Sequence, residues 1–582
     1  MLFLNRLTYG ETARSTPSSK SSLRQHYDAA YRFQSSGHLA QADSEYKLFL
    51  AEALHRLANG RANIGDYARA VPFYDEALKL APDFAGYFDY AGAALDARDP
   101  SKARLLAQNA LSLYSKNATN VQNAKAHLIL GHALRTMSEK KEAIGQFKTA
   151  VALDPDFEDV YALGAAYLAL PDKENAARTF VNMLAGFGDT AIMHMDLGRA
   201  YGEAGYPDEA IQEFKKAIAK NNRLPGAHYS LGASYINKSG EIAFSQAEPE
   251  FRKEVAIQPN DSFSYPQLGR IATARHRFQE AEVDLNRAIT LNPKNPDTFF
   301  LLGELYAEMH RLSDAEAALR KAIAATTDPS ENHYEVQHVH YRLGRLLIES
   351  GDIAEGKKEM QIAEALLLES RRRDDSSMAG KPVIHAPLLK TRARASLDDV
   401  AAEKMFENQV GPLIAGCYSN LGVNAAVGRD YAAAAEDFER AAQWNPALHG
   451  LDTNWGTAAF AARDYAQAVG PLSRSLQVHP EDVQIRSMLG VSEYMIHDYD
   501  KAVRTMRVIE AHVDTVPSLK FAYAESMLKT GDLRHGIERL QSLAQSDPEN
   551  RAIHSALAEA YRENAQPEEA DREAKLSQAL SK

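Results

Sequence analysis

The feature that most constrains this chain is a pattern of residue types that recurs at a nearly constant interval. Two segments show it clearly, LGRAYGEAGYPDEAIQEFKKAIA from Leu197 and LGELYAEMHRLSDAEAALRKAIA from Leu302. Each begins with Leu-Gly-x-x-Tyr and then places an Ala, a large apolar residue and a second Ala at the same intervals. Self-similarity of this kind predicts a stack of similar helical units rather than a single globular core.

Further copies keep the same frame along most of the chain. A Leu-Gly pair, or Trp-Gly in one copy, marks them at Leu130, Leu163, Leu231, Leu268, Leu343, Leu421, Trp455 and Leu489. Weaker copies lie around Phe33, Tyr74, Gly92, Tyr523 and Leu557. Together these segments give about 15 copies in one frame, which makes a chance alignment a poor explanation.

The spacing has a physical reason. Gly or Ala at the points where two antiparallel helices touch lets their backbones approach closely, and the large apolar side chains fill the space between them. Pro155 and Pro293 each follow a copy, and Pro ends a helix because it has no backbone N–H to donate. The pattern therefore predicts an all-α chain in which each helix pair completes its core against its neighbours.

This pattern resembles the tetratricopeptide repeat, a helix pair of about 34 residues. In the frame of that family, Leu-Gly stands at repeat positions 7 and 8, and Tyr stands at position 11. The resemblance covers most of the chain and implies a right-handed superhelical α-solenoid of antiparallel helix pairs. The alternatives are another helical-hairpin repeat of similar curvature and an unrelated helical bundle.

One polar segment interrupts the repeats. Residues 371–410 contain Gly380, Pro382 and Pro387 within a charged stretch, which is typical of a linker or insertion. A short helix is expected over 398–408, capped by Ser396. The alternative is a basic docking or processing segment.

The break divides the chain into four expected parts. Residues 1–22, rich in Ser and Thr, form a disordered leader, and residues 23–370 form an N-terminal array. The linker at 371–410 follows, and residues 411–582 form a C-terminal array. The last helix has polar positions where an interior copy is apolar, which suits a capping helix.

Composition excludes several classes of protein. The net charge is -12, so bulk electrostatics do not favour binding to nucleic-acid phosphates. No stretch approaches 18 apolar residues, so no membrane insertion is expected. Cys417 is the single cysteine, and it cannot form an internal disulfide or a cysteine-based zinc site. We expect a cytoplasmic protein, or a periplasmic one if an export signal precedes this start.

No arrangement of catalytic residues stands out. The glycines in AGFGDTA follow no strand, and neither a G-x-S-x-G elbow nor an H-E-x-x-H pair is present. His338 and His340 are two residues apart, so on a helix they point to different faces. We therefore expect no enzyme activity, no cofactor and no metal site.

The resemblance also implies a binding face. In the tetratricopeptide family, positions 2, 5, 6, 9 and 12 of the first helix face the inner side of the solenoid. Position 5 is aromatic and position 9 is Arg in several copies, which gives the candidate residues Tyr161, Arg199, Tyr229, Arg270, Phe300, Tyr341 and Arg345.

Aromatic rings and guanidinium groups suit an extended peptide with acidic or C-terminal carboxylate groups. The alternative is that the rings pack between neighbouring first helices and that the arginines pair with acidic neighbours such as Glu304. Both interpretations remain open at this point.

Two subfamilies offer a comparison. The chaperone-binding type carries Lys and Asn at positions 5 and 9, and neither Tyr161 with Ala165 nor Tyr229 with Ala233 matches. The glycosyltransferase type carries Asn at position 6, where only Asn420 and Asn454 match. Their amide groups are candidates for holding a peptide backbone, because an amide both donates and accepts hydrogen bonds.

These observations favour a non-catalytic protein-interaction scaffold whose partner is a protein or peptide. One alternative is a regulatory or substrate-recruiting subunit of a separate enzyme such as a transferase. Another is an envelope or secretion assembly factor. Fold resemblance alone does not choose between them.

Overall fold

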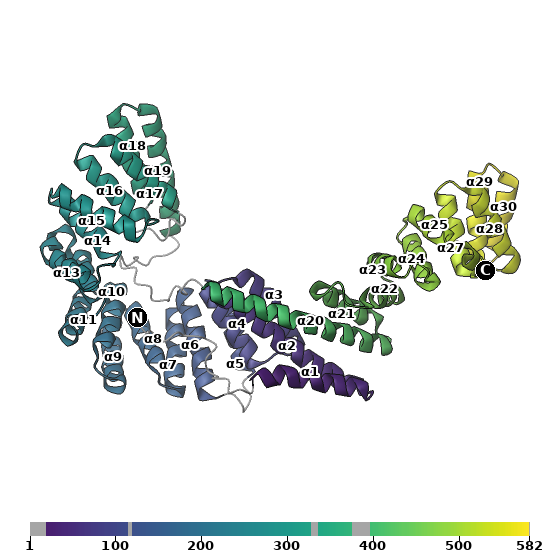
Figure 1. Cartoon of the computed structure of the whole chain (residues 1–582), viewed down its shortest axis with the longest axis horizontal. Helices are drawn as coiled ribbons and strands as arrows, with labels where there is room; N and C mark the ends of the chain where they lie inside the picture. The colour runs from purple at the N-terminus through teal and green to yellow at the C-terminus, as the bar shows by residue number, and fades with distance from the viewer. Residues whose placement is uncertain (1–18, 114–118, 327–335, 375–395, 581–582) are drawn as a thin grey trace. The chain divides into compact units, whose positions relative to one another are not determined.

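The computed structural model describes residues 19–113, 119–326, 336–374 and 396–580. Within these residues every regular element is a helix, and the helices follow one another as antiparallel pairs (Figure 1). This confirms the all-α fold of stacked helix pairs. The described residues fall into two compact units, one formed by Met1–Ala97 with Arg392–Lys582 and the other by Arg98–Thr391.

Unit 2, residues 98–391, is a continuous run of helix pairs. Its helices are α5 (Pro100–Ser112), α6 (Asn120–Thr136), α7 (Lys140–Leu153), α8 (Phe157–Ala169), α9 (Lys173–Phe187), α10 (Ala191–Glu203), α11 (Pro207–Lys220), α12 (Ala227–Ser239), the 3-10 turn η1 (Gly240–Ala243), α13 (Phe244–Ile257), α14 (Ser264–Ala274), α15 (Phe278–Leu291), α16 (Pro296–Glu308), α17 (Leu312–Ala325), α18 (Val336–Ser350) and α19 (Ile353–Asp374). From α6 onward the even-numbered helices are the first, or A, helix of each copy, and the odd-numbered helices are the second, or B, helix.

Unit 1 joins the two ends of the sequence. Its helices are α1 (Ser19–Ser35), α2 (Leu39–Asn63), α3 (Tyr67–Leu80), α4 (Phe84–Asp96), α20 (Leu397–Val427), α21 (Tyr431–Trp444), α22 (Leu451–Ala461), α23 (Tyr465–Val478), α24 (Val483–Met495), α25 (Tyr499–Arg507), α26 (Glu510–Val513), α27 (Pro517–Lys529), α28 (Leu533–Ser546), α29 (Arg551–Glu563) and α30 (Pro567–Ala579). From α21 to α25 the odd-numbered helices are B helices.

This division differs from the expected arrays at 23–370 and 411–582. The first helices, through Ala97, belong with the C-terminal part rather than with the helices that follow them in sequence. The physical reason is one shared apolar core, in which Tyr46 and Leu50 of α2 pack with Ile414 and Tyr418 of α20.

The contact between α2 and α20 is also polar. The amide of Asn420 donates to the hydroxyl of Tyr46 (2.9 Å), and the amide of Asn424 donates to Asp43 (2.7 Å). Arg61 donates to Glu407 over 2.7 Å. Because buried polar groups need partners, these bonds fix how the two helices lie against each other.

Both ends of the expected linker, 371–374 and 397–410, are helical. Helix α19 ends at Asp374, and α20 begins at Leu397. Ser396 caps α20 in a capping box with Asp399, so the predicted cap is confirmed. The helix does not end near 408. It is 31 residues long in all, and its C-terminal part is the first helix of the next copy. Residues 375–395 lie outside the described residues, as do residues 1–18 of the expected leader, whereas α1 begins at Ser19.

Small residues at position 8 allow the close packing that the pattern predicted. A Cβ atom added to Gly131 would lie 2.5 Å from Cε1 of Phe147, and one added to Gly198 would lie 2.6 Å from Cε1 of Phe214. Real side chains do not tolerate such separations, so the phenyl ring of the B helix needs a glycine on the A helix.

A polar bond between the A and B helices recurs within the copies. His at position 4 of the A helix bonds through Nδ1 to Glu at position 23 of the B helix, in the pairs His26–Glu45, His194–Glu213, His228–Glu250, His340–Glu359 and His554–Glu573. In one copy the partner is an amide, in the pair His127–Gln146. This explains His340 as a residue of the helix interface rather than a metal ligand.

Candidate peptide-binding surface on the A helices

Three neighbouring A helices of unit 2 bring ionisable groups together. We call His132 and Arg135 of α6, Tyr161 of α8, and Asp196, Arg199 and Glu203 of α10 the Arg135 cluster. Helices α6 and α8 pack side by side, as do α8 and α10. Two of these residues, Tyr161 and Arg199, are candidates from the sequence, and the structure places them in one cluster.

Hydrogen bonds inside the cluster are few. The hydroxyl of Tyr161 donates to the backbone carbonyl of Asp196 (3.3 Å), and Arg199 forms an ion pair with Asp196. Arg135 approaches Nδ1 of His132 at 3.4 Å. Tyr161 also packs its ring against Phe157, with centroids 6.0 Å apart. The aromatic ring thus has both a packing role and a place beside the charged groups.

Burial changes the charge of this cluster. It raises the pKa of Glu203 to about 7, because the positive charges of Arg135 and Arg199 offset the loss of hydration only in part. Burial, together with Arg135, lowers the pKa of His132 to about 3. Burial also lowers the pKa of Arg135 from its very high ordinary value. At neutral pH His132 is therefore neutral and Glu203 is partly protonated. The cluster carries an excess of positive charge within an acidic protein.

One of its donors has no acceptor among the residues that the structure describes. The Nε atom of Arg199 is buried without a hydrogen-bond partner. Arg135 forms no ion pair within 4 Å in the same part of the chain, although it interacts electrostatically with Glu203. Unpartnered buried donors are costly, so a ligand that supplies an acceptor would be bound favourably.

A second, more aromatic surface lies on α12 and α14. The ring of Tyr229 lies 5.9 Å from that of Phe263, which is 59% exposed. Arg270 places its guanidinium 5.5 Å from the ring centroid of Phe244. Tyr229 thus packs against a residue at the start of the neighbouring A helix, as the alternative interpretation expects. Arg270 packs on a phenyl ring, whereas that interpretation expects an acidic partner, and Phe263 is open to solvent.

The remaining candidates of unit 2 differ in their exposure to solvent. Phe300 is 7% exposed and packs against Leu319 and Leu343 in the core, so its placement on an open binding face is wrong. Tyr341 and Arg345 are exposed. Glu304 does not pair with Arg345 but accepts from both Nε and Nη2 of Arg342.

The two asparagines of unit 1 also differ. Asn420 is half-buried and donates from its amide to Tyr46 of α2, so it contributes to the packing of α20. Asn454 is exposed on α22. The two amides therefore do not form a ladder.

Sequence reasoning missed Arg135, Glu203 and Phe263 as members of these surfaces. Arg135 stands at position 12 and Phe263 at position 2, which are both inward positions in the family frame. A search of every inward position for charged and aromatic residues, rather than of positions 5 and 9 alone, would have found both. Burial of the carboxyl of Glu203 has no sequence signal.

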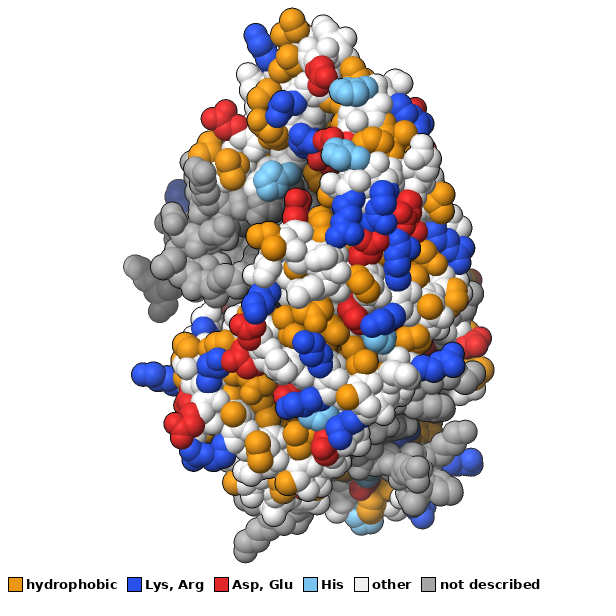
Figure 2. All heavy atoms as spheres, turned by 90° about the vertical axis from the view of Figure 1, so that its left-hand side faces the viewer, with side chains coloured by type: hydrophobic (Ala, Val, Ile, Leu, Met, Phe, Trp, Pro, Cys, Tyr) orange, Lys and Arg blue, Asp and Glu red, His pale blue; other side chains and the backbone are white. Residues whose placement is uncertain are grey.

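Several other charges of unit 2 are paired within the protein. Glu248 is the partner of Arg252, Arg275 and Arg277 at 2.6–2.9 Å. Figure 2 shows one face on which Lys and Arg side chains lie beside Asp and Glu side chains, with hydrophobic side chains between them. Groups already neutralised in this way offer less to a charged ligand than the Arg135 cluster does.

Among the described residues, no group of three or more His, Cys, Asp or Glu side chains is placed to hold a metal ion. In the same residues, no helix combines the length and apolar character that crossing a membrane requires.

Comparison with known proteins finds tetratricopeptide repeats in several parts of the chain. Four segments match models described as tetratricopeptide repeat, at residues 51–84, 191–219, 272–335 and 453–512. The human tetratricopeptide repeat protein 6 is 24% identical over 210 residues, which are 36% of this chain and 39% of that protein. The chain thus spans well under half the length of this relative.

Solved structures with a similar fold cover part of the chain. A tetratricopeptide repeat protein from Parabacteroides merdae is 15% identical and covers 46% of this chain and 98% of its own, with a TM-score of 0.33. MamA from Desulfovibrio magneticus RS-1 is 20% identical and covers 33% of this chain and 99% of its own, with a TM-score of 0.26.

Proposed function

Because the chain is a tetratricopeptide repeat protein, we propose that it is a non-catalytic scaffold that binds an extended peptide segment of a partner protein. The repeat fold suggests protein–protein interaction in general. The proposed site is the A-helix face of α6, α8 and α10, and the proposed feature of the peptide is a carboxylate, from Asp, Glu or the chain terminus.

The observation that carries this proposal is the pair of guanidinium groups of Arg135 and Arg199. They belong to one cluster, and the donor atom Nε of Arg199 is buried without an acceptor. Guanidinium binds carboxylate through parallel hydrogen bonds, which are stronger than bonds between neutral groups. The ring of Tyr161 between them adds apolar contact at low entropic cost.

The test is a peptide array probed with the purified full-length chain. Wild type should retain peptides that carry Asp, Glu or a free C-terminal carboxylate more strongly than the same peptides with Asn, Gln or a C-terminal amide. The double variant Arg135→Gln/Arg199→Gln should lose that preference, with each lost charged bond costing about 1.5–3 kcal/mol.

The matched control is Arg178→Gln on the B helix α9. Arg178 is exposed and pairs with Glu174 one turn away, so its loss should leave binding unchanged. Retention of carboxylate peptides by the double variant at the wild-type level, with an unchanged circular dichroism spectrum, would refute the proposal.

A further inference from the structure

One copy in unit 1 departs from the repeat pattern at several buried positions. Its A helix is α24 and its B helix is α25. Position 11 is Glu493, whereas Tyr201, Tyr235 and Tyr306 occupy the same position in other copies. Glu493 is only 3% exposed. A carboxyl group at a packing position is costly to bury unless something satisfies it.

The bond between A and B helices is also changed in this copy. Positions 4 and 23, which are His and Glu in five other copies, are Arg486 and Thr505. Arg486 donates instead to the backbone carbonyl of Pro480, 2.7 Å away. The short side chain of Thr505 does not reach position 4, and the space between the helices is left partly unfilled.

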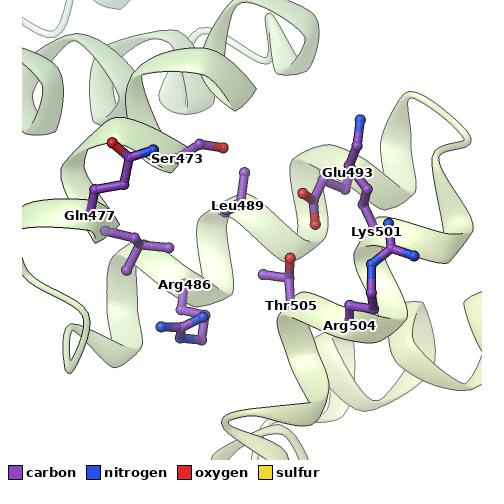
Figure 3. Close-up of a pocket in the computed structure, with 9 residues that line it drawn as sticks. Ser473, Gln477, Arg486, Leu489, Glu493, Lys501, Arg504 and Thr505 are labelled. Atoms are coloured by element: carbon purple, nitrogen blue, oxygen red, sulfur yellow. The ribbon is translucent and has the colours of Figure 1, made fainter.

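A recess of about 360 Å³ occupies this place. Its lining comes from α23, α24 and α25 and consists of Ser473, Leu476, Gln477, Arg486, Leu489, Glu493, Lys501, Arg504 and Thr505 (Figure 3). The volume lies within the range of about 300–1,000 Å³ that is usual for small-molecule sites. Figure 3 shows the carboxyl group of Glu493 and the hydroxyl group of Thr505 facing each other across the space between α24 and α25.

The charges of the recess are incompletely paired. The hydroxyl group of Thr505 faces the carboxyl group of Glu493 (Figure 3), but Oε2 of Glu493 is buried without a partner among the described residues. Lys501 forms an ion pair with Asp498 over 2.6 Å. Arg504 is exposed and forms no ion pair within 4 Å in the same part of the chain. The unpartnered carboxyl oxygen of Glu493 thus lies close to the guanidinium group of Arg504, which has no ion-pair partner among the described residues.

We propose that this recess binds an α-carboxylate whose α-carbon carries an N–H donor and an apolar side chain. The carboxylate accepts hydrogen bonds from Arg504, and the N–H group donates to Oε2 of Glu493. Leu476 and Leu489 provide the apolar wall for the side chain. A free α-amino acid and the C-terminal residue of a peptide share this chemistry. The site is independent of the Arg135 cluster, which belongs to the other compact unit.

Titration calorimetry of the full-length chain with matched probes tests this proposal. L-Leucine and N-acetyl-L-leucine represent the two sources, and at least one of them should bind with a Kd of about 1 mM or tighter. N-acetyl-L-leucinamide lacks the carboxylate, and 4-methylpentanoate lacks the N–H group. Both should bind at least roughly tenfold more weakly. Binding of L-leucine alone identifies a free amino acid, and binding of N-acetyl-L-leucine alone identifies a chain terminus.

Variants connect the binding to these residues. Arg504→Gln should weaken binding at least roughly tenfold, while Arg534→Gln, an exposed arginine on α28, should not change it. Glu493→Tyr restores the residue found at position 11 in other copies, so it should abolish binding while the chain stays folded, with an equal or higher Tm. The proposal is overturned if neither leucine probe binds wild type, or if binding persists unchanged in Arg504→Gln and in Glu493→Tyr.

Discussion

The Oε2 atom of Glu573 lies 2.6 Å from Nδ1 of His554, and both side chains are buried between α29 and α30. His554 also bonds the backbone carbonyl of Pro548 through Nε2, at 2.9 Å. Burial alone would lower the pKa of His554, but the bonds to Glu573 and Pro548 outweigh it and raise the pKa above its ordinary value. The protonated form of His554 therefore stabilises the last helix pair more than the neutral form does.

This relationship makes the stability of the last helix pair depend on pH. A raised pKa in the folded state gives stability that is fully present below the unfolded value of about 6.5 and is lost as pH rises through the folded pKa. Hydrogen exchange of the α29–α30 peptides, corrected for the intrinsic rate, should therefore show protection that falls as pH rises through that window.

The control is Glu573→Gln, which copies the bond that His127 and Gln146 form in unit 2. Without the carboxylate the pH dependence should largely disappear while the helices stay paired. Glu573→Ala removes the partner altogether and should cost about 1–3 kcal/mol of local stability. Equal pH dependence in wild type and Glu573→Gln would contradict the assignment to this pair.

Close helix packing at position 8 leads to a second prediction. Gly131→Ala should destabilise unit 2 by about 1–3 kcal/mol, because the added methyl group meets the ring of Phe147 at 2.5 Å. Gly145→Ala on the partner helix α7 meets no atom within 4 Å and should stabilise by roughly 0.5–1 kcal/mol, since Ala favours helix over Gly. Thermal unfolding followed by circular dichroism distinguishes the two signs, and destabilisation of similar size in both variants would show that ring contact is not the cause.

Features that depend on neighbours in sequence were predictable, and those that depend on distant contacts were not. The helix pairs and the cap at Ser396 follow from local spacing and hydrogen bonding. The bond between Tyr46 and Asn420 joins residues 374 positions apart, and nothing in the repeat pattern indicates which copies lie side by side. Phe300 and Tyr341 both stand at position 5, so the pattern predicted an open face for both. Phe300 is buried because α18 packs against it, and the position of Phe300 in its own copy does not indicate that contact.

The packing of the N-terminal helices on the C-terminal part leads to a third prediction. Phe73 of α3 stacks on Trp444 of α21, with ring centroids 5.7 Å apart. Cys417 of α20 is fully buried in the core that these helices share, and burial raises the pKa of its thiol. Because it is the only cysteine, its reaction with a thiol reagent reports opening of this core.

Phe73→Ala and Trp444→Ala should each speed the modification of Cys417 by roughly tenfold, equivalent to about 1.4 kcal/mol. The free-energy effect of the double variant should be smaller than the sum of the two single effects by about 0.5–1.5 kcal/mol, because both changes remove the same contact. Phe187→Ala in unit 2 serves as the control and should leave the rate unchanged. Additive effects of the two substitutions would mean that the rings do not pack together in solution.

The buried carboxyl group of Glu203 leads to the last prediction. Its folded pKa of about 7 lies above the unfolded value, so ionisation disfavours the folded state as pH rises from about 4.5 to 7. Glu203→Gln should therefore stabilise unit 2 at pH 8, by roughly 1–2 kcal/mol after allowance for solvent screening, and should change little at pH 5. The measurement is the unfolding midpoint of both proteins at the two pH values.

The same substitution removes a negative charge beside Arg135 and Arg199, so carboxylate peptides should bind the variant at pH 8 as well as they bind wild type at pH 6. If the variant is instead destabilised at pH 8, Glu203 acts mainly as an ionised partner of these arginines. The cluster would then have no excess positive charge, and the proposed peptide site would lose its basis.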